Sequence, residues 1–313
     1  MKKLSMIVPC YNESAVLRAF YSETTGVLNN LDGFEWELIF ADDGSSDDTI
    51  RIIASLARTD AHVKYVSFSR NFGKESAMLA GLRGATGDYV GFIDADLQHS
   101  PDMIPGMLNA VAVEGFDVAA CRRVDRAGEN GLKSALSAGF YKIVNKISDT
   151  YIDDGAQDYR IFNRKVADAI LAMPEHNRFT KGIFPWVGFS TKWFPHENRE
   201  RAAGTSKWSL FKLVRYAFDG ILGYTDAPLK VPLFLGAGLT ALSVIYLIIT
   251  VIIDAVKANF GFTNCFIIFL IMFIGGLLLL SVGIVGEYIA RIYAESKDRP
   301  QYLIKYTNID SLI

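Results

Sequence analysis

Residues 89–98 decide how the chain is interpreted; they read Tyr-Val-Gly-Phe-Ile-Asp-Ala-Asp-Leu-Gln. An apolar, β-rich run ends directly in two carboxylates and an amide. On an extended backbone, residues i and i+2 point to the same side, so Asp94 and Asp96 face one point. Two such acids repel each other unless a positive group lies between them, and Mg²⁺ or Mn²⁺ shares such oxygen ligands with phosphates. The segment predicts a metal–diphosphate site; the alternative is a solvated acidic turn.

Short apolar runs alternate with helical patterns through the first half of the chain. Strand-like runs cover 4–9, 35–41, 63–68, 89–93 and 116–121, and a helical pattern follows each of the first four. This alternation predicts an α/β fold with a doubly wound, mostly parallel sheet. Ligands of such sheets bind beyond the carboxyl ends of the strands. Polar clusters follow the first, second and fourth runs, so we expect one site at that edge.

Composition and hydropathy indicate a membrane protein that does not bind nucleic acid. The 313 residues carry a formal net charge of −2, which excludes a global basic field. Residues 231–253 contain no charge, and neither do residues 266–286. Each run has the length that a helix needs to cross a bilayer. Basic residues flank the pair on both outer sides, whereas the connecting loop holds only Lys257, which predicts cytoplasmic ends.

We therefore expect four parts in the chain. A catalytic domain covers 1–207, and an amphipathic segment lying in the membrane interface covers 208–230. Two transmembrane helices, 231–253 and 266–288, form a hairpin within 231–290, and a cytoplasmic tail covers 291–313. The three cysteines are scattered without metal or disulfide spacing, as expected for a reduced compartment.

Two common nucleotide-binding classes do not fit the sequence. No G-x-G-x-x-G follows the first strand-like run, which disfavours a dinucleotide-dependent oxidoreductase. The segment Gly73-Lys74-Glu75-Ser76 lacks the upstream glycine and the spacing of a phosphate-binding P-loop, which disfavours a kinase or ATPase.

Five motifs in order carry a family resemblance. They read Val-Pro-Cys-Tyr-Asn-Glu at 8–13, Asp-Asp-Gly-Ser at 42–45, Asn-Phe-Gly-Lys at 71–74, Asp-Ala-Asp-Leu-Gln at 94–98 and Gly-Ala-Gln-Asp-Tyr-Arg at 155–160. With them the chain resembles the inverting nucleotide-sugar glycosyltransferases of the GT-A fold. Within these it is most similar to the polyprenyl-phosphate glycosyltransferases, which include dolichol-phosphate mannose synthases and bactoprenol glucosyltransferases. The resemblance covers essentially the whole chain, membrane hairpin included.

The resemblance implies a role for each matching residue. The catalytic residues would be Asp94, Asp96 and Asp158, and a Mg²⁺ or Mn²⁺ ion would bind Asp94, Asp96 and Gln98. The donor-binding residues would be Pro9, Tyr11, Glu13, Asp42, Asp43, Lys74, Arg201 and Lys207. Asp42 and Asp43 have an alternative role in capping and turn formation. Arg201 and Lys207 belong to a loop that resembles the family's R-x-x-G-x-S-K lid.

The acceptor phosphate would bind Arg122, Lys133, Ser137 and Arg160. Lys133 and Ser137 are spaced i, i+4, which places them on one face of a helix. Asp158 is either a general base or an orienting acid. A lipid monophosphate is already ionised at neutral pH, so an orienting role is the better interpretation.

These expectations describe an enzyme of the cytoplasmic membrane, multi-pass, with its catalytic domain in the cytoplasm. It would move a sugar, with glucose as the first choice, from a UDP-sugar to undecaprenyl or another polyprenyl phosphate, and resemblance suggests a homotetramer. N-acetylglucosamine, an aminopentose or mannose are alternative sugars. Other interpretations are a processive polysaccharide synthase, disfavoured because no Arg-Trp pair follows Gln98, Gln157 or Gln301, and a non-catalytic nucleotide-sugar-binding scaffold.

Overall fold

The structure is a computed structural model that describes residues 1–123, 155–173, 175, 178–196, single positions between 232 and 249, and 263–312. The chain forms two compact units. One consists of Met1–Lys146, Thr150–Gly220 and Pro300–Ile313, and the other of Ile147–Asp149 and Ile221–Arg299. Each unit is described by itself.

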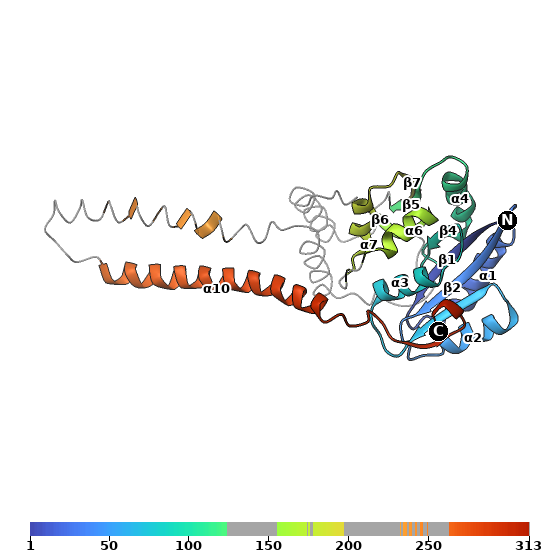
Figure 1. The fold of residues 1–313 in the computed structure, drawn as a ribbon, viewed down its shortest axis with the longest axis horizontal. Helices are drawn as coiled ribbons and strands as arrows, with labels where there is room; N and C mark the ends of the chain where they lie inside the picture. Colours follow the sequence, from blue (N-terminus) through green and yellow to red (C-terminus); the bar gives the residue numbers. More distant parts are fainter. Residues whose placement is uncertain are drawn as a thin grey trace. The chain divides into compact units, whose positions relative to one another are not determined.

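An eight-stranded mixed sheet is the centre of the first unit (Figure 1). Its strands, in spatial order, are β7 (Thr191–His196), β5 (Val118–Arg123), β6 (Ala156–Asn163), β4 (Tyr89–Phe92), β1 (Lys2–Cys10), β2 (Phe34–Asp42), β3 (Val63–Phe68) and β8 (Ile304–Thr307). The inner strands β4, β1, β2 and β3 are parallel to their neighbours in this group. β6 and β8 run antiparallel to the strands beside them.

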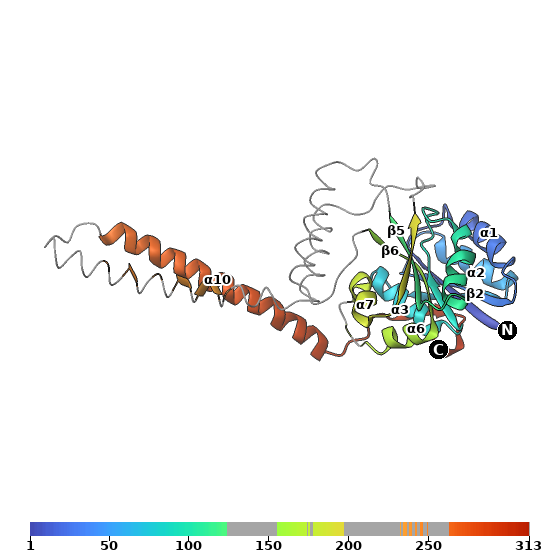
Figure 2. The ribbon, with the colours of Figure 1, turned by 90° about the horizontal axis from the view of Figure 1, so that it is seen from above.

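Helices cover both faces of this sheet (Figure 2). One face carries α1 (Leu17–Leu28), α2 (Thr49–Thr59) and α4 (Ile104–Ala112), which follows the short helix η1 (Pro101–Met103). The other carries α3 (Lys74–Gly84), α6 (Arg164–Leu171) and α7 (Thr180–Val187), and η2 (Asp310–Leu312) contacts α3. Because both faces are covered, residues 4–8 of β1 are all buried, and all of them except Ser5 are apolar.

The packing of α3 against β1 matters most for the site. A Cβ atom on Gly81 of α3 would lie 2.3 Å from Cγ2 of Ile7, so only glycine allows the helix to approach the strand this closely. Met78, Leu79 and Leu82 on the same helix are buried as well. This contact fixes α3, whose first residue, Lys74, lies at the candidate site.

The mostly parallel, doubly wound sheet predicted from the sequence is confirmed. The strand expected at 63–68 has those bounds, and the one expected at 116–121 forms two residues later, as Val118–Arg123. The sequence did not indicate the antiparallel strands. β6 inserts between β4 and β5, and β8 pairs with β3 at the sheet edge.

The segment expected as a cytoplasmic tail, 291–313, differs from that expectation. Helix α10 (Thr263–Ser296) extends into this segment, and β8 then joins the sheet of the first unit. The ring of Tyr302 stacks on Phe68 of β3 with centroids 4.8 Å apart, which anchors this segment through buried aromatic surface.

The second unit contains one long described helix, α10 (Thr263–Ser296). Its part Phe273–Ser296 is long and apolar enough to cross a membrane, and the most apolar stretch of this part is not buried within the protein. The expected second span, 266–288, falls within this helix. The expected first span, 231–253, is described only at single positions, and the amphipathic segment 208–230 lies outside the described residues.

Candidate active site

The polar clusters predicted from the sequence meet at one edge of the sheet. Strands β1 to β4 are parallel, so their carboxyl ends lie together. β5 and β7 end at the same edge, because both run antiparallel to β6, which itself runs antiparallel to β4. β6 therefore begins there: Arg160 pairs with Phe92, which places Asp158 beside the residues that follow β4.

An ammonium group joins two of the predicted catalytic acids. Nζ of Lys74 lies 2.7 Å from Oδ1 of Asp94 and 2.7 Å from Oδ2 of Asp158. The three side chains are 39%, 28% and 22% exposed, respectively, so the cluster opens to solvent. A lysine in the first turn of a helix opposes the helix dipole. The two carboxylates supply the compensating charge.

Lys74 and Asp158 are both charged at neutral pH. Burial would lower the pKa of Lys74, but the carboxylates of Asp158 and Asp94 raise it above its ordinary value. Burial would raise the pKa of Asp158, but the cations of Lys74, Lys181 and Arg160 hold it well below its usual range. A carboxylate with so low a pKa is a weak general base. Asp158 is therefore suited to orienting cations rather than to taking a proton.

Asp43 fixes the start of α3. Its carboxylate accepts hydrogen bonds from the backbone N–H groups of Phe72 at 2.6 Å and Gly73 at 2.9 Å. Burial raises its pKa to about 6 in spite of these bonds. Gly44 beside it has φ +65°, and a Cβ there would lie 2.4 Å from the backbone of Arg70. The loop before α3 therefore crosses directly over Gly44.

Asp42 is also engaged within the fold. Its Oδ1 accepts from the N–H of Ser45 at 3.2 Å and its Oδ2 from the hydroxyl of Ser67 at 2.7 Å. Both aspartates are buried and make the turn and capping contacts that the sequence offered as their alternative role.

The loop after β1 is tied to the loop after β2. The N–H of Asn12 donates to Oγ of Ser45, and its side-chain oxygen accepts from the N–H of Ser46. Tyr11 is 36% exposed beside this junction, whereas Pro9 and Glu13 are half-buried. Burial raises the pKa of the Cys10 thiol, and nearby carboxylates raise it further; these belong to Asp42, Glu13, Asp94 and Asp47. The predicted donor-binding acids therefore gather around the end of β1.

The predicted metal-binding turn has a constrained backbone. Oδ1 of Asp96 accepts from the N–H of Gln98 at 3.1 Å, and Leu97 between them has φ +59°. Asp94, Asp96 and Gln98 are half-buried. Within the described ranges, no group of three or more His, Cys, Asp or Glu side chains could hold a metal ion.

The acceptor residues divide into described and undescribed positions. Arg122 pairs with Ala156 where β5 ends. Arg160 is 3% exposed; its guanidinium donates to the carbonyl of Gln157 at 2.6 Å and lies 4.0 Å above the ring of Phe184. The other predicted residues lie outside the described ranges; they are Lys133, Ser137, Arg201 and Lys207.

Comparison with known proteins identifies the chain. Residues 5–171 match glycosyl transferase family 2, and residues 227–292 match the GtrB C-terminal hairpin. The chain belongs to glycosyl transferase family 2. With this family and this sheet it has the GT-A fold that the motifs implied.

Full-length relatives of this family 2 glycosyltransferase come from bacteria and phages. The putative glycosyltransferase CsbB of Bacillus subtilis is 41% identical over 98% of this chain and 92% of its own. The bactoprenol glucosyl transferase of Shigella phage SfV is 39% identical over 97% of this chain and 98% of its own. The prophage bactoprenol glucosyl transferase homolog of Escherichia coli K12 is 38% identical over 97% and 98%, respectively.

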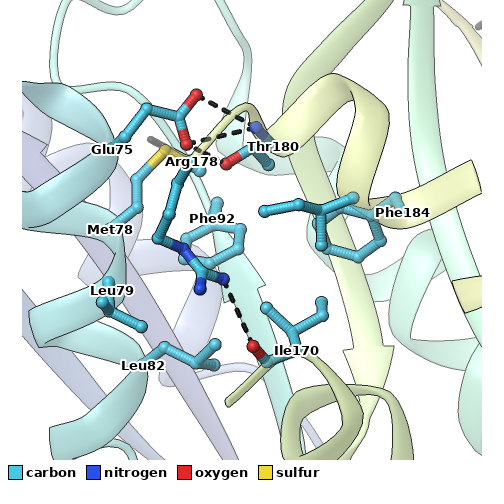
Figure 3. A pocket seen from close by; sticks show the side chains of 10 residues that line it. Glu75, Met78, Leu79, Leu82, Phe92, Ile170, Arg178, Thr180 and Phe184 are labelled. Atoms are coloured by element: carbon cyan, nitrogen blue, oxygen red, sulfur yellow. Dashed lines mark hydrogen bonds between the residues drawn. The ribbon is translucent and has the colours of Figure 1, made fainter. Parts of the chain in front are cut away.

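The structure of this glycosyltransferase adds residues that the sequence did not single out. The carboxylate of Glu75, next to Lys74, accepts hydrogen bonds from the backbone N–H and the hydroxyl of Thr180 (Figure 3). This contact docks the first turn of α7 onto α3. Burial raises the pKa of Glu75, and the nearby Asp158 raises it further.

An apolar pocket lies beneath this contact, between α3, α6 and α7 (Figure 3). The Arg178 guanidinium enters it and donates to the carbonyls of Met173 and Ile170 at 2.9 and 3.2 Å. Lys181, the residue after Thr180, acts electrostatically on Asp158. The sequence contained no signal for the contact between Glu75 and Thr180, because these residues are 105 positions apart in the chain.

Proposed function

We propose that this family 2 glycosyltransferase moves glucose from UDP-glucose to a polyprenyl phosphate. The observation that carries the proposal is the 39% identity to a bactoprenol glucosyl transferase over 97% of this chain and 98% of the relative. That match includes both the catalytic domain and the hairpin region, so it favours the same acceptor lipid and the same sugar.

In the proposed reaction, an oxygen of the acceptor phosphate attacks the anomeric carbon of the sugar. The bond from that carbon to the diphosphate breaks, its electron pair leaves with UDP, and the configuration inverts. A phosphate monoester is ionised at neutral pH, so no side chain has to remove a proton. Asp158, itself ionised, anchors the Lys74 ammonium, which is placed to stabilise negative charge on the donor.

A divalent cation fits the residues present. Asp94, Asp96 and Gln98 offer hard oxygen ligands, and Asp94 already binds a cation, the Lys74 ammonium. Mg²⁺ or Mn²⁺ commonly uses only one or two carboxylates and completes its ligand shell with phosphate oxygens and water, which agrees with a site of two acids. When bound, the metal would neutralise charge on the leaving diphosphate.

The remaining assignments extend this proposal. Pro9, Tyr11, Glu13, Asp42, Asp43, Arg201 and Lys207 would surround the nucleotide, and Arg122, Lys133, Ser137 and Arg160 would bind the acceptor phosphate. The four-part domain division is retained, with the change that the segment after α10 contributes β8 to the catalytic unit. The hairpin would span the cytoplasmic membrane twice with the catalytic domain inside, and the assembly would be a homotetramer.

A product assay tests the function. Purified full-length protein is incubated with Mn²⁺, undecaprenyl phosphate and either UDP-glucose, UDP-N-acetylglucosamine or GDP-mannose, and lipids are analysed by mass spectrometry. We expect hexosyl-undecaprenyl phosphate from UDP-glucose, lost in Asp96→Asn and retained in Asp32→Asn, which changes an exposed aspartate in the same way. Folded protein that yields no glycolipid from any donor would refute the proposal.

A further inference from the structure

Two buried histidines lie directly behind the predicted metal-binding turn. His99 follows Gln98 in the chain, and His196 is the last residue of β7. They are 7% and 6% exposed. Their rings are 4.9 Å apart between centroids and inclined by 31°, so the two imidazoles pack against each other. Neither histidine was assigned a role in the analysis of the sequence.

Each imidazole makes a hydrogen bond that joins the turn to another element. Nε2 of His196 lies 3.1 Å from the carbonyl oxygen of Gln98, and because a carbonyl only accepts, the ring nitrogen donates. Nε2 of His99 lies 2.5 Å from the side-chain Oε1 of Gln157. Gln157 directly precedes Asp158. The pair therefore connects the turn that carries Asp94 and Asp96 to both β7 and the start of β6.

Burying His99 costs free energy, which indicates that this side chain has a specific role. Its Nδ1 is buried and has no hydrogen-bond partner in the part of the chain that the structure describes. A buried polar atom without a partner costs free energy that an apolar side chain would not. The ring of Tyr159 packs 5.4 Å away and its hydroxyl donates to the carbonyl of Ser100, which confines the imidazole to this orientation.

We infer that His99 and His196 are positioning residues that hold the 94–98 turn at a fixed separation from Asp158, and that they thereby set the affinity for the metal–diphosphate group of the donor. The inference rests on the proposed function. Neither side chain has to touch the donor. Hydrogen-bonding groups behind a metal site typically change metal affinity about 10–100-fold when removed, because they orient the ligands.

The experiment compares isosteric pairs of variants in the full-length protein. Glutamine can place an amide N–H near the position of Nε2, whereas leucine fills the space without a donor, so His99→Gln is compared with His99→Leu and His196→Gln with His196→Leu. Mn²⁺ binding in the presence of UDP is measured by the loss of the free-ion EPR signal, and kcat and KM for both substrates are measured in parallel. His62→Gln is the control, because His62 is 54% exposed and stacks on Trp36 away from the site.

We expect the leucine variants to bind Mn²⁺ with UDP at least about 10-fold more weakly and to have a lower kcat. In the glutamine variants and the His62 variant, Mn²⁺ affinity and kcat should stay within about 3-fold of the wild-type values. The KM for the lipid should be unchanged in all variants. Leucine variants that bind Mn²⁺ like the wild type, or glutamine variants that lose affinity equally, would overturn the inference. Because EPR does not require turnover, a wild type that binds Mn²⁺ and UDP but makes no glycolipid would refute only the proposed function.

Discussion

Replacing Lys74 by methionine removes the cation between Asp94 and Asp158 while keeping much of the side-chain length. Both acids lie 2.7 Å from Nζ in the structure. Without the ammonium they face each other at roughly 4–5 Å, where two charges at an effective dielectric constant of about 20 repel by on the order of 3–4 kcal/mol. The side chains are 22–39% exposed, so solvent reduces this to about 1–2 kcal/mol.

This repulsion changes the pH dependence. In the wild type the pKa of Asp158 is lowered, so its contribution to stability is present above the unfolded value near 3.9 and is lost as pH falls through the folded pKa. The pKa of Lys74 is raised, so its contribution is present below about 10.4 and is lost as pH rises through the folded pKa. Burial raises the pKa of Asp158 and Lys74 is the first of the cations that lower it, so this pKa rises in Lys74→Met.

The assay is the initial rate of glycolipid formation between pH 5 and 8 for the wild type, Lys74→Met and Lys74→Arg. We expect kcat/KM of Lys74→Met to be at least about 10-fold lower at pH 7, and the ratio of its rate to that of the wild type to fall further towards pH 5. Taking this ratio at each pH removes the effect that ionisation of the lipid phosphate has on both rates. Lys74→Arg retains the charge and should follow the wild-type profile. A methionine variant with the wild-type rate and profile would refute the role given to Lys74.

Three further predictions concern the scaffold of the site, each measured as thermal unfolding of the full-length protein. Gly44→Ala should lower stability by about 1–3 kcal/mol because it forces a Cβ against the neighbouring backbone at positive φ. The control is Gly26→Ala, which adds a Cβ in open space on α1 and should be neutral or stabilising. Equal effects of the two substitutions would contradict the packing argument. Burial raises the pKa of Asp43 to about 6, so its neutral form contributes stability that is fully present below about pH 4 and is lost as pH rises through 6. The free energy of unfolding of Asp43→Asn should therefore increase relative to that of the wild type as pH rises over this range. A difference that stays constant with pH would contradict this prediction. Burial would raise the pKa of Glu37, but hydrogen bonds from Lys3 and Ser5 lower it. Glu37→Gln should lower the free energy of unfolding by about 1–3 kcal/mol at pH 7, and this loss should shrink as pH falls through the folded pKa. A loss that does not depend on pH would contradict the ionic account.

Local sequence patterns were sufficient to predict the parallel core of the fold. Central strands buried on both faces read as continuous apolar runs, and each ends in polar residues at one edge, so both the strands and the position of the site follow from short segments. Asp94 and Asp158 come together as the motifs implied, although 64 residues separate them in the numbering.

Long-range pairing could not be predicted in this way. β8 joins β3 from the other end of the chain, and β6 enters antiparallel, because strand partners depend on the whole topology rather than on local periodicity. The same limit applies to side chains. The contact of Lys74 with Asp158 and the bond between His99 and Gln157 join segments that no spacing rule connects.

The most direct test of the account is an anomalous diffraction map of the full-length protein crystallised with Mn²⁺ and UDP. The account predicts a manganese peak within coordination distance of the Asp94 and Asp96 carboxylates and of the diphosphate, with Lys74 still hydrogen-bonded to Asp158. A manganese ion and UDP bound elsewhere on the protein, with the carboxyl edge of the sheet empty, would contradict it.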